Sequence, residues 1–193
     1  MTEYEALIAS DRVSSQTRNV LLERGKLDDV GYTPDCLDQQ ELHTLRALLA
    51  RVIPQNAGAD TVVIDLAARL DAQLSTGKGD GWRYAALPAD TEAYRIGLQL
   101  LDSFAHKLSS IPFDRLASDA QDALISSIAS GTITSKKLDL RRWFEDVRSD
   151  ATKLFVAHPQ TLASMGYSGI ADNEHGFVQL GIGEREAWEP EPR

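Results

Sequence analysis

The chain has 193 residues, with 20 Lys and Arg against 29 Asp and Glu, which gives a formal net charge of -9 at pH 7. An acidic chain is a poor binder of nucleic acid and of anionic lipid, because both are bound through basic side chains. The hydrophobic fraction of 42% excludes wholesale disorder, and no apolar run approaches the roughly 20 residues of a membrane span.

Residues 1–36 are predicted to be an N-terminal arm. The segment is polar and carries charges of both signs. Three apolar residues, 20–22, precede Gly25, which is typical of a short helix that ends at a glycine. Segments of this kind more often clamp a neighbour or are loosely held than form part of a core. The helical domain is therefore predicted to span residues 37–159.

That domain begins with a strong helix-start signal. Asp38 can accept hydrogen bonds from the first backbone N–H groups of a helix, and Glu41 can reach back to the backbone of Asp38. Leu37 and Leu42 occupy the positions of a hydrophobic staple. Apolar residues follow at helical spacing until Pro54 ends the run.

Two further helices are predicted in the next part of the chain. The first begins near Thr61, and the second runs from about Asp90 to Ser109 and is followed by Pro112. The residues predicted on the buried faces of these two helices are Val63, Ala67, Leu70, Leu74, Tyr94, Leu98, Leu101, Ala105 and Leu108.

The last two predicted helices complete the domain. One begins at Ser118, with Gln121 at the capping-box position, and ends at Gly131. The other runs from about Leu138 to His158 and is ended by Pro159. The inward residues predicted for the pair are Leu124, Ile125, Ile128, Leu140, Phe144, Val147, Ala151, Leu154 and Phe155.

Residues 160–193 form a third segment, which is rich in glycine and aromatic residues and ends in an acidic stretch with prolines. Residues 177–180 could form at most one short strand. The sequence therefore predicts an all-α protein, an irregular bundle of about five core helices with an N-terminal arm and a glycine-rich C-terminal segment.

No pattern for catalysis or metal binding stands out. A helical di-iron site needs Glu-x-x-His pairs, and none of the four histidines has a glutamate three residues before it. The single cysteine, Cys36, can neither close an internal disulfide nor hold a zinc site alone, and the nearby Asp35 and Asp38 should raise its thiol pKa. We therefore predict no catalytic, cofactor-binding or metal-binding residue in this chain.

The loop over residues 75–84 holds three glycines followed by Trp82, Arg83 and Tyr84. It is a poor phosphate loop, because no strand precedes it and Asp80 would repel a phosphate. Aromatic and arginine side chains on a loop are typical of an interface anchor. Trp82 could equally cover the core of the bundle, and both interpretations remain open.

A set of motifs near the C-terminus carries family information. His158-Pro159, Gly166-Tyr167, Gly169-Ile170-Ala171 and Gly176-Phe177 together resemble the C-terminal signature of the gluconate 2-dehydrogenase subunit 3 family. Further motifs that look like those of this family are Arg51-Val52-Ile53-Pro54, Gly79-Asp80-Gly81-Trp82-Arg83-Tyr84 with the following Leu87-Pro88, and Trp188-Glu189-Pro190. The resemblance covers roughly Leu37 to Pro190.

The resemblance implies a small accessory subunit of a membrane-associated or soluble FAD-dependent sugar or polyol dehydrogenase. The large partner would be a flavoprotein of the glucose–methanol–choline type that holds the FAD, and a cytochrome c subunit would be a further partner. The small subunit would hold neither flavin nor haem and would not be catalytic alone; its role would be to stabilise the large subunit. The alternative is a stand-alone helical assembly factor that releases its client.

The residues predicted to contact the partner are Trp82, Tyr84, His158, Gly166, Tyr167, Gly169, Phe177 and Trp188. The aromatic residues would act as anchors, the glycines as sharp turns and His158 as a helix-end hydrogen bond. If the C-terminal segment is ordered, either a partner surface or the chain's own helices must cover its aromatic side chains.

The N-terminus shows neither the pattern of a signal peptide nor a twin-arginine pair. The expected location is therefore the cytoplasm, or the periplasm if the chain is exported with a partner that bears a signal. Expected partners do not include nucleic acid, and no direct membrane span is expected.

Overall fold

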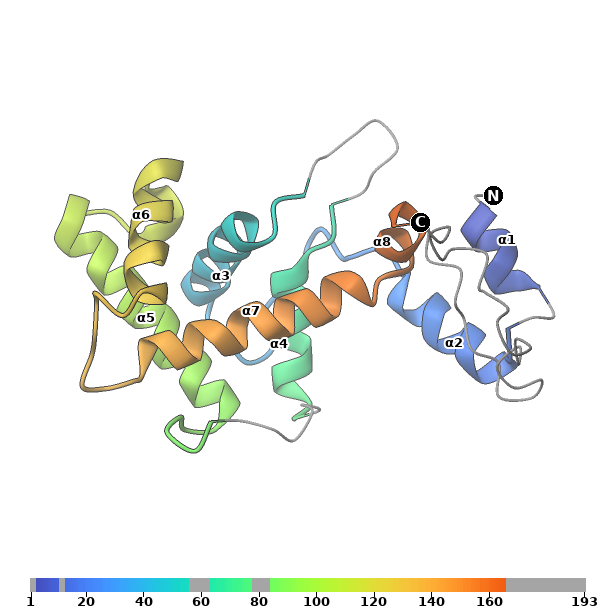
Figure 1. Cartoon of the computed structure of the whole chain (residues 1–193), viewed down its shortest axis with the longest axis horizontal. Coiled ribbons are helices and arrows are strands. Elements are labelled where there is room, and N and C mark those ends of the chain that lie inside the picture. Colours follow the sequence, from blue (N-terminus) through green and yellow to red (C-terminus); the bar gives the residue numbers. More distant parts are fainter. Residues whose placement is uncertain (1–2, 11–12, 56–62, 78–83, 166–193) are drawn as a thin grey trace, which may run out of the picture. The chain divides into compact units, whose positions relative to one another are not determined.

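The computed structural model describes residues 3–10, 13–55, 63–77 and 84–165, and its regular elements are helices (Figure 1). They are α1 (Glu3–Ala9), α2 (Ser15–Arg24), α3 (Gln39–Val52), α4 (Leu66–Ser75), α5 (Asp90–Ser109), the 3-10 helix η1 (Phe113–Arg115), α6 (Ser118–Ala129), α7 (Leu140–Val156) and α8 (Pro159–Ser164). No strand occurs in these described ranges, which confirms the predicted all-α class.

The chain forms two compact units. The larger unit spans Leu27–Phe155 and holds α3 to α7, whereas the smaller one combines Met1–Lys26 with Val156–Arg193 and holds α1, α2 and α8. The helical domain predicted over residues 37–159 stays a prediction. The two N-terminal helices share a unit with the helix that follows α7.

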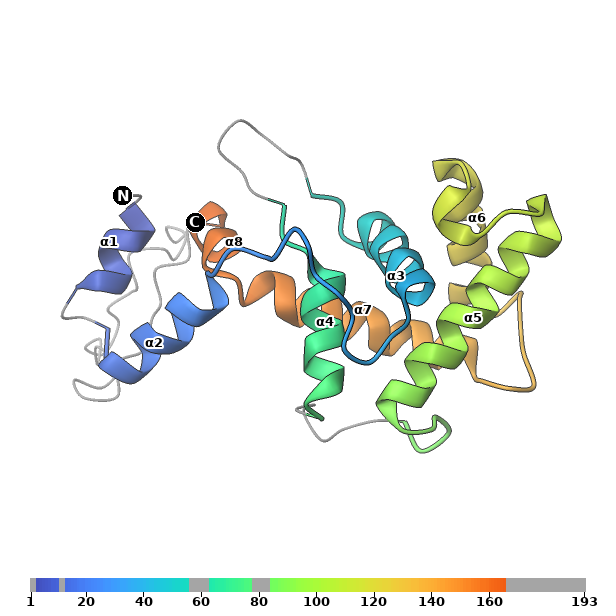
Figure 2. The ribbon, with the colours of Figure 1, turned by 180° about the vertical axis from the view of Figure 1, so that it is seen from behind.

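Helix α3 is the centre of the larger unit. It lies between α4 and the pair formed by α5 and α6, and it contacts all three (Figures 1 and 2). Its predicted capping box is confirmed: the Glu41 N–H donates to Asp38 Oδ1 at 2.7 Å, and the Asp38 N–H donates to Glu41 Oε2 at 2.9 Å. The start of the central helix is therefore fixed by local hydrogen bonds.

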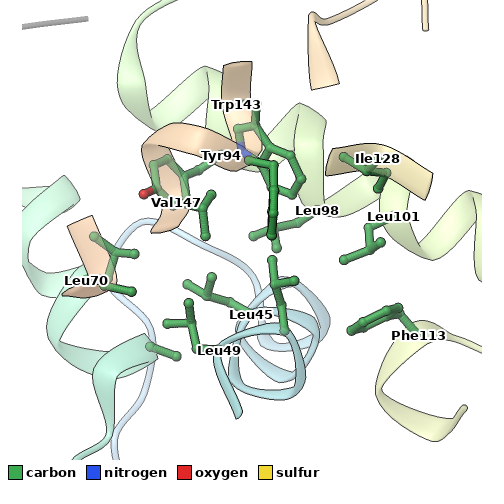
Figure 3. Close-up of a cluster of buried hydrophobic side chains, with 14 of the residues drawn as sticks. Leu45, Leu49, Leu70, Tyr94, Leu98, Leu101, Phe113, Ile128, Trp143 and Val147 are labelled. Atoms are coloured by element: carbon green, nitrogen blue, oxygen red, sulfur yellow. The ribbon is translucent and has the colours of Figure 1, made fainter. Parts of the chain in front are cut away.

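The core of the larger unit gathers side chains from every helix that it contains. Figure 3 shows them converging, and the labelled residues are Leu45, Leu49, Leu70, Tyr94, Leu98, Leu101, Phe113, Ile128, Trp143 and Val147. Trp143 is 1% exposed and packs directly on Gly97 of α5. A residue without a side chain lets the indole lie against the helix backbone at this point.

The predicted start of the helix near Thr61 is wrong, because α4 begins at Leu66. The N-cap is Asp65, whose Oδ1 accepts the Ala68 N–H at 3.1 Å. Val63, predicted on a buried face, precedes the helix and is 50% exposed.

Two details of α5 and α6 also differ from the prediction. Leu108, near the end of α5, is 62% exposed and not buried. At the start of α6 the N-cap is Ala117, without a side-chain cap. Gln121 is buried and donates from Nε2 to the Phe113 carbonyl oxygen at 2.9 Å, so its amide serves η1 and not a capping box.

Pro159 was predicted to end the last long helix, and it instead begins a new one. Helix α7 ends at Val156, and Pro159 is at the first position of α8. A proline suits this position because the first N–H of a helix has no partner within the helix and the ring already holds a helical φ.

The smaller unit has its own apolar cluster. Three of its side chains are buried: Ile8 of α1, Val13 between the two N-terminal helices, and Leu21 of α2. The partly buried Leu162 and Ala163 of α8 pack against them. The N-terminal helices are thus packed on α8.

Candidate functional site

The structure describes two of the eight residues predicted to contact a partner. Tyr84 precedes α5 in the larger unit, and His158 precedes α8 in the smaller unit. The other six lie outside the described residues, namely Trp82, Gly166, Tyr167, Gly169, Phe177 and Trp188.

Tyr84 is half-buried against helix α7. Its hydroxyl donates to Glu145 Oε2 at 3.1 Å, and the Arg142 guanidinium carbon lies 4.9 Å from the centre of its ring. The hydrogen bond to Glu145 and partial burial raise the pKa of the Tyr84 phenol. Both ends of the side chain are therefore held by one helix, which fixes the end of the loop that carries the other predicted aromatic anchor.

His158 forms a helix-end hydrogen bond, and it does so at the start of α8. The ring is buried, and its Nδ1 accepts the backbone N–H of Gln160 at 3.2 Å. This geometry is that of an N-cap, where a side-chain acceptor satisfies one of the unpaired N–H groups of the first turn. A contact of His158 with a partner stays a prediction.

The cap predicts a specific mutational pattern. His158→Ala is expected to lower the free energy of unfolding of the smaller unit by about 1 kcal/mol, because the Gln160 N–H loses its acceptor. His158→Asp restores an acceptor and is expected to recover most of this loss. Hydrogen exchange of the α8 amides measures the effect, and equal protection in the alanine and aspartate variants would contradict it.

A buried polar residue that the sequence analysis missed is Asp71 of α4, in the larger unit. Its side chain is fully buried and accepts four hydrogen bonds from a single segment. The donors are the Tyr32 hydroxyl at 2.7 Å and the backbone N–H groups of Asp35, Cys36 and Leu37 at 2.6, 3.3 and 2.7 Å. Asp71 therefore ties the segment before α3 to α4.

The electrostatics of this cluster follow from its burial and hydrogen bonds. Burial alone would raise the pKa of the Asp71 carboxyl, but the four donors stabilise the carboxylate and leave its pKa below the ordinary value. Burial and the neighbouring Asp71 raise the pKa of the Cys36 thiol to about 11. The direction expected for Cys36 is confirmed, but the responsible acid is not one of its neighbours in sequence.

A sequence signal for this cluster was present. Asp71 is four residues after Ala67 and one after Leu70, so it belongs to the apolar face of an amphipathic helix. A carboxylate on such a face is costly unless buried donors surround it. A buried carboxylate surrounded by hydrogen-bond donors was therefore predictable at this position, whereas the identity of the donors was not.

Other buried polar groups are also bonded within the chain. The Tyr94 hydroxyl donates to Asp150 Oδ2 at 2.9 Å, and burial together with this carboxylate raises the pKa of Tyr94 well above its ordinary value. Asp102 Oδ1 accepts from the Thr44 hydroxyl at 3.0 Å and from the Phe113 N–H at 2.9 Å. These groups join helices to one another.

Two further properties of the described residues concern metal ions and membranes. No group of three or more His, Cys, Asp and Glu among them is arranged to hold a metal ion. None of the helices in the described ranges is long and apolar enough to cross a membrane.

Comparison with known proteins identifies the family. The family model described as gluconate 2-dehydrogenase subunit 3 matches residues 39–171. No curated protein and no solved structure matches the chain. The family is that of a subunit in a multi-subunit dehydrogenase, which implies partner subunits. Since the matched residues make up more than half of the chain, the protein belongs to the gluconate 2-dehydrogenase subunit 3 family.

Proposed function

We propose that this chain is the non-catalytic small subunit of an FAD-dependent sugar or polyol dehydrogenase. It stabilises a large flavoprotein subunit of the glucose–methanol–choline type, which binds the FAD and oxidises the substrate. A cytochrome c subunit is a further partner that would accept the electrons. The observation that carries this proposal is the family match over residues 39–171.

The chemistry of the larger unit supports a structural role. Asp71, Tyr94 and Asp102 are the kinds of groups that serve as acids or bases in enzymes, but each is bonded to other parts of the same unit. Removing one of these groups would disturb helix packing. These three groups thus have a role in packing within the unit, and we assign the catalytic groups to the large subunit.

The predicted partner contacts are concentrated after α8. Tyr167, Phe177 and Trp188 follow the last described helix in sequence, and aromatic side chains are the usual anchors of protein interfaces. We therefore assign the C-terminal segment, residues 166–193, to binding of the large subunit.

A chain that ends at Met165 tests this assignment. It keeps all the described helices, so its far-ultraviolet circular dichroism should retain the helical signal of the full chain. Loss of one buried aromatic anchor typically costs about 2 kcal/mol or more, so binding of the large subunit should weaken at least about 30-fold. The measurements are co-purification with a candidate large flavoprotein subunit that is co-expressed with this chain, and dye-linked oxidation of sugars.

Point variants provide the matched control. Trp188→Ala should weaken binding, whereas Glu189→Ala, at the neighbouring position, should leave it within about twofold. Equal binding by the full and shortened chains would show that residues 166–193 do not hold the partner. Release of this chain once the flavoprotein has folded would identify an assembly factor in place of a permanent subunit.

A further inference from the structure

A short segment of the larger unit presents aliphatic side chains to solvent before α3 begins. Within residues 27–32, Leu27 is 81% exposed and Val30 is fully exposed. Single exposed aliphatic residues are common on protein surfaces and need no explanation by themselves. The backbone around Val30, however, is held in place by hydrogen bonds on both sides, which gives this residue a defined position.

Val30 is at the tip of a hydrogen-bonded turn. The Tyr32 N–H donates to the Asp29 carbonyl oxygen at 3.1 Å, and the Gly31 N–H donates to Asp29 Oδ1 at 2.8 Å. Val30 and Gly31 are thus the two central residues of a four-residue turn. Such positions usually carry Pro, Asp, Asn, Ser or Gly, for reasons of backbone conformation. A fully exposed, β-branched aliphatic residue departs from this preference, and departures of this kind are expected at functional sites.

Side chains before and after the tip hold the turn against α4. Asp28 accepts from the Asp65 N–H at 2.7 Å and from Arg69 Nε at 2.6 Å. The Tyr32 hydroxyl donates to the buried carboxylate of Asp71 at 2.7 Å. Figure 2 shows the segment before α3 passing beside α4. The tip therefore stands on a fixed backbone, and a protein that binds it does not have to order the turn first.

The charge beside the tip is negative. Asp28 is paired with Arg69, whereas Asp29 is exposed next to Val30. The chain as a whole carries a net charge of -9, so no excess of basic residues offsets this carboxylate. A surface that covers the tip should therefore offer an apolar pocket for Val30 and a basic side chain for Asp29, because a like charge there would be costly.

We propose that the turn over residues 27–32 is an anchor for the large dehydrogenase subunit. Val30 enters an apolar pocket of that subunit, and Asp29 faces a basic side chain at the edge of the pocket. This inference rests on the proposed function, since the family match is what implies partner subunits. The turn precedes residue 39, where the match begins, and it is separate from the C-terminal segment assigned to binding above.

Val30→Ser in the full chain tests the anchor, and Leu108→Ser is the matched control. Leu108 is also an exposed aliphatic residue of the larger unit, at the end of α5. Val30→Ser should weaken binding of a purified candidate large flavoprotein subunit at least about tenfold, because the burial of one aliphatic side chain is lost. Leu108→Ser should stay within about twofold, and Val30→Leu should stay within about threefold because it keeps an apolar tip. Calorimetry measures the four affinities.

Asp29→Asn tests the charge beside the tip. The amide oxygen can still accept the Gly31 N–H, so the turn is kept while the negative charge is removed. At low salt the variant should bind the same flavoprotein about three- to tenfold more weakly than the wild type. This difference should shrink in about 0.5 M NaCl, where exposed charges are screened.

The outcomes separate the anchor from the proposed function. Weaker binding by Val30→Ser, with binding retained by Leu108→Ser and Val30→Leu, supports the anchor. Equal binding by the wild type and Val30→Ser overturns the anchor and leaves the proposed function in place, and equal losses by Val30→Ser and Leu108→Ser also overturn it.

Two further results would count against the proposal. An unchanged affinity of Asp29→Asn at low salt overturns the basic edge of the pocket. A change in the sedimentation of the free chain with Val30→Ser, without a change in flavoprotein binding, would assign the turn to self-association and overturn the anchor. If the wild-type chain and every variant fail to bind the flavoprotein, the proposed function fails, and this inference fails with it.

Discussion

Gly97→Ala is expected to lower the free energy of unfolding of the larger unit by about 2–3 kcal/mol. A Cβ at this position would lie 2.5 Å from Cδ2 and Cζ2 of the Trp143 indole and closer still to Cε2. Alanine favours a helix over glycine by about 1 kcal/mol, but forcing a methyl group into a packed core typically costs about 1–3 kcal/mol or more. Since the obstacle is the rigid ring of Trp143, which is 1% exposed, the steric cost should exceed the gain in helix propensity.

A double-mutant cycle with Trp143→Leu tests the cause. The indole Nε1 has no hydrogen-bond partner among the described residues, so replacing the ring removes packing and no hydrogen bond. In the leucine background Gly97→Ala should become neutral or stabilising by about 0.5–1 kcal/mol. Denaturant unfolding followed by circular dichroism measures all four proteins. An equal loss in both backgrounds would show that the Gly97–Trp143 contact is not the cause.

Asp71→Ala is expected to destabilise the larger unit by about 3–5 kcal/mol. The substitution removes a carboxylate that is itself fully buried, and it leaves the half-buried Tyr32 hydroxyl and the N–H groups of Asp35 and Leu37 without their charged acceptor. Asp35→Ala is the matched control, since it removes an exposed carboxylate from the same cluster and should change stability by less than about 0.5 kcal/mol. Denaturant unfolding compares the two, and similar losses would contradict the assignment.

The same carboxylate should contribute to acid sensitivity. The pKa of Asp71 is lower in the folded than in the unfolded chain, so the native state holds this proton less tightly. The stabilisation is therefore fully present above the unfolded pKa, near 4, and is lost as pH falls through the lower folded pKa. Asp71→Asn should be less stable than the wild type at pH 7, and the difference should shrink below about pH 4. A constant difference at all pH values would exclude this contribution.

The sequence by itself determined the helices whose signals are local. The capping box of Asp38 and Glu41 involves groups three residues apart, and the structure confirms it. The span of α5 was also predicted correctly, from periodicity and from the proline that follows it. Family membership was accessible in the same way, because it depends on the order of short motifs along the chain.

Part of the candidate site was predictable on the same basis. The His-Pro pair indicated a helix-end hydrogen bond, whereas the contact of Tyr84 with a partner, expected from the composition of its loop, stays a prediction. The partners of Tyr84, Arg142 and Glu145, come from a helix that begins more than 50 residues later. No local sequence pattern near Tyr84 identifies these two partners.

Only the tertiary structure decided what the buried polar and small residues do. Asp71 is bound by a segment more than 30 residues before it, and Gly97 is required by the ring of Trp143 on another helix. Local signals arise from hydrogen bonds and periodicity within a few residues, whereas burial depends on which distant segments pack together, and that information is distributed over the whole chain.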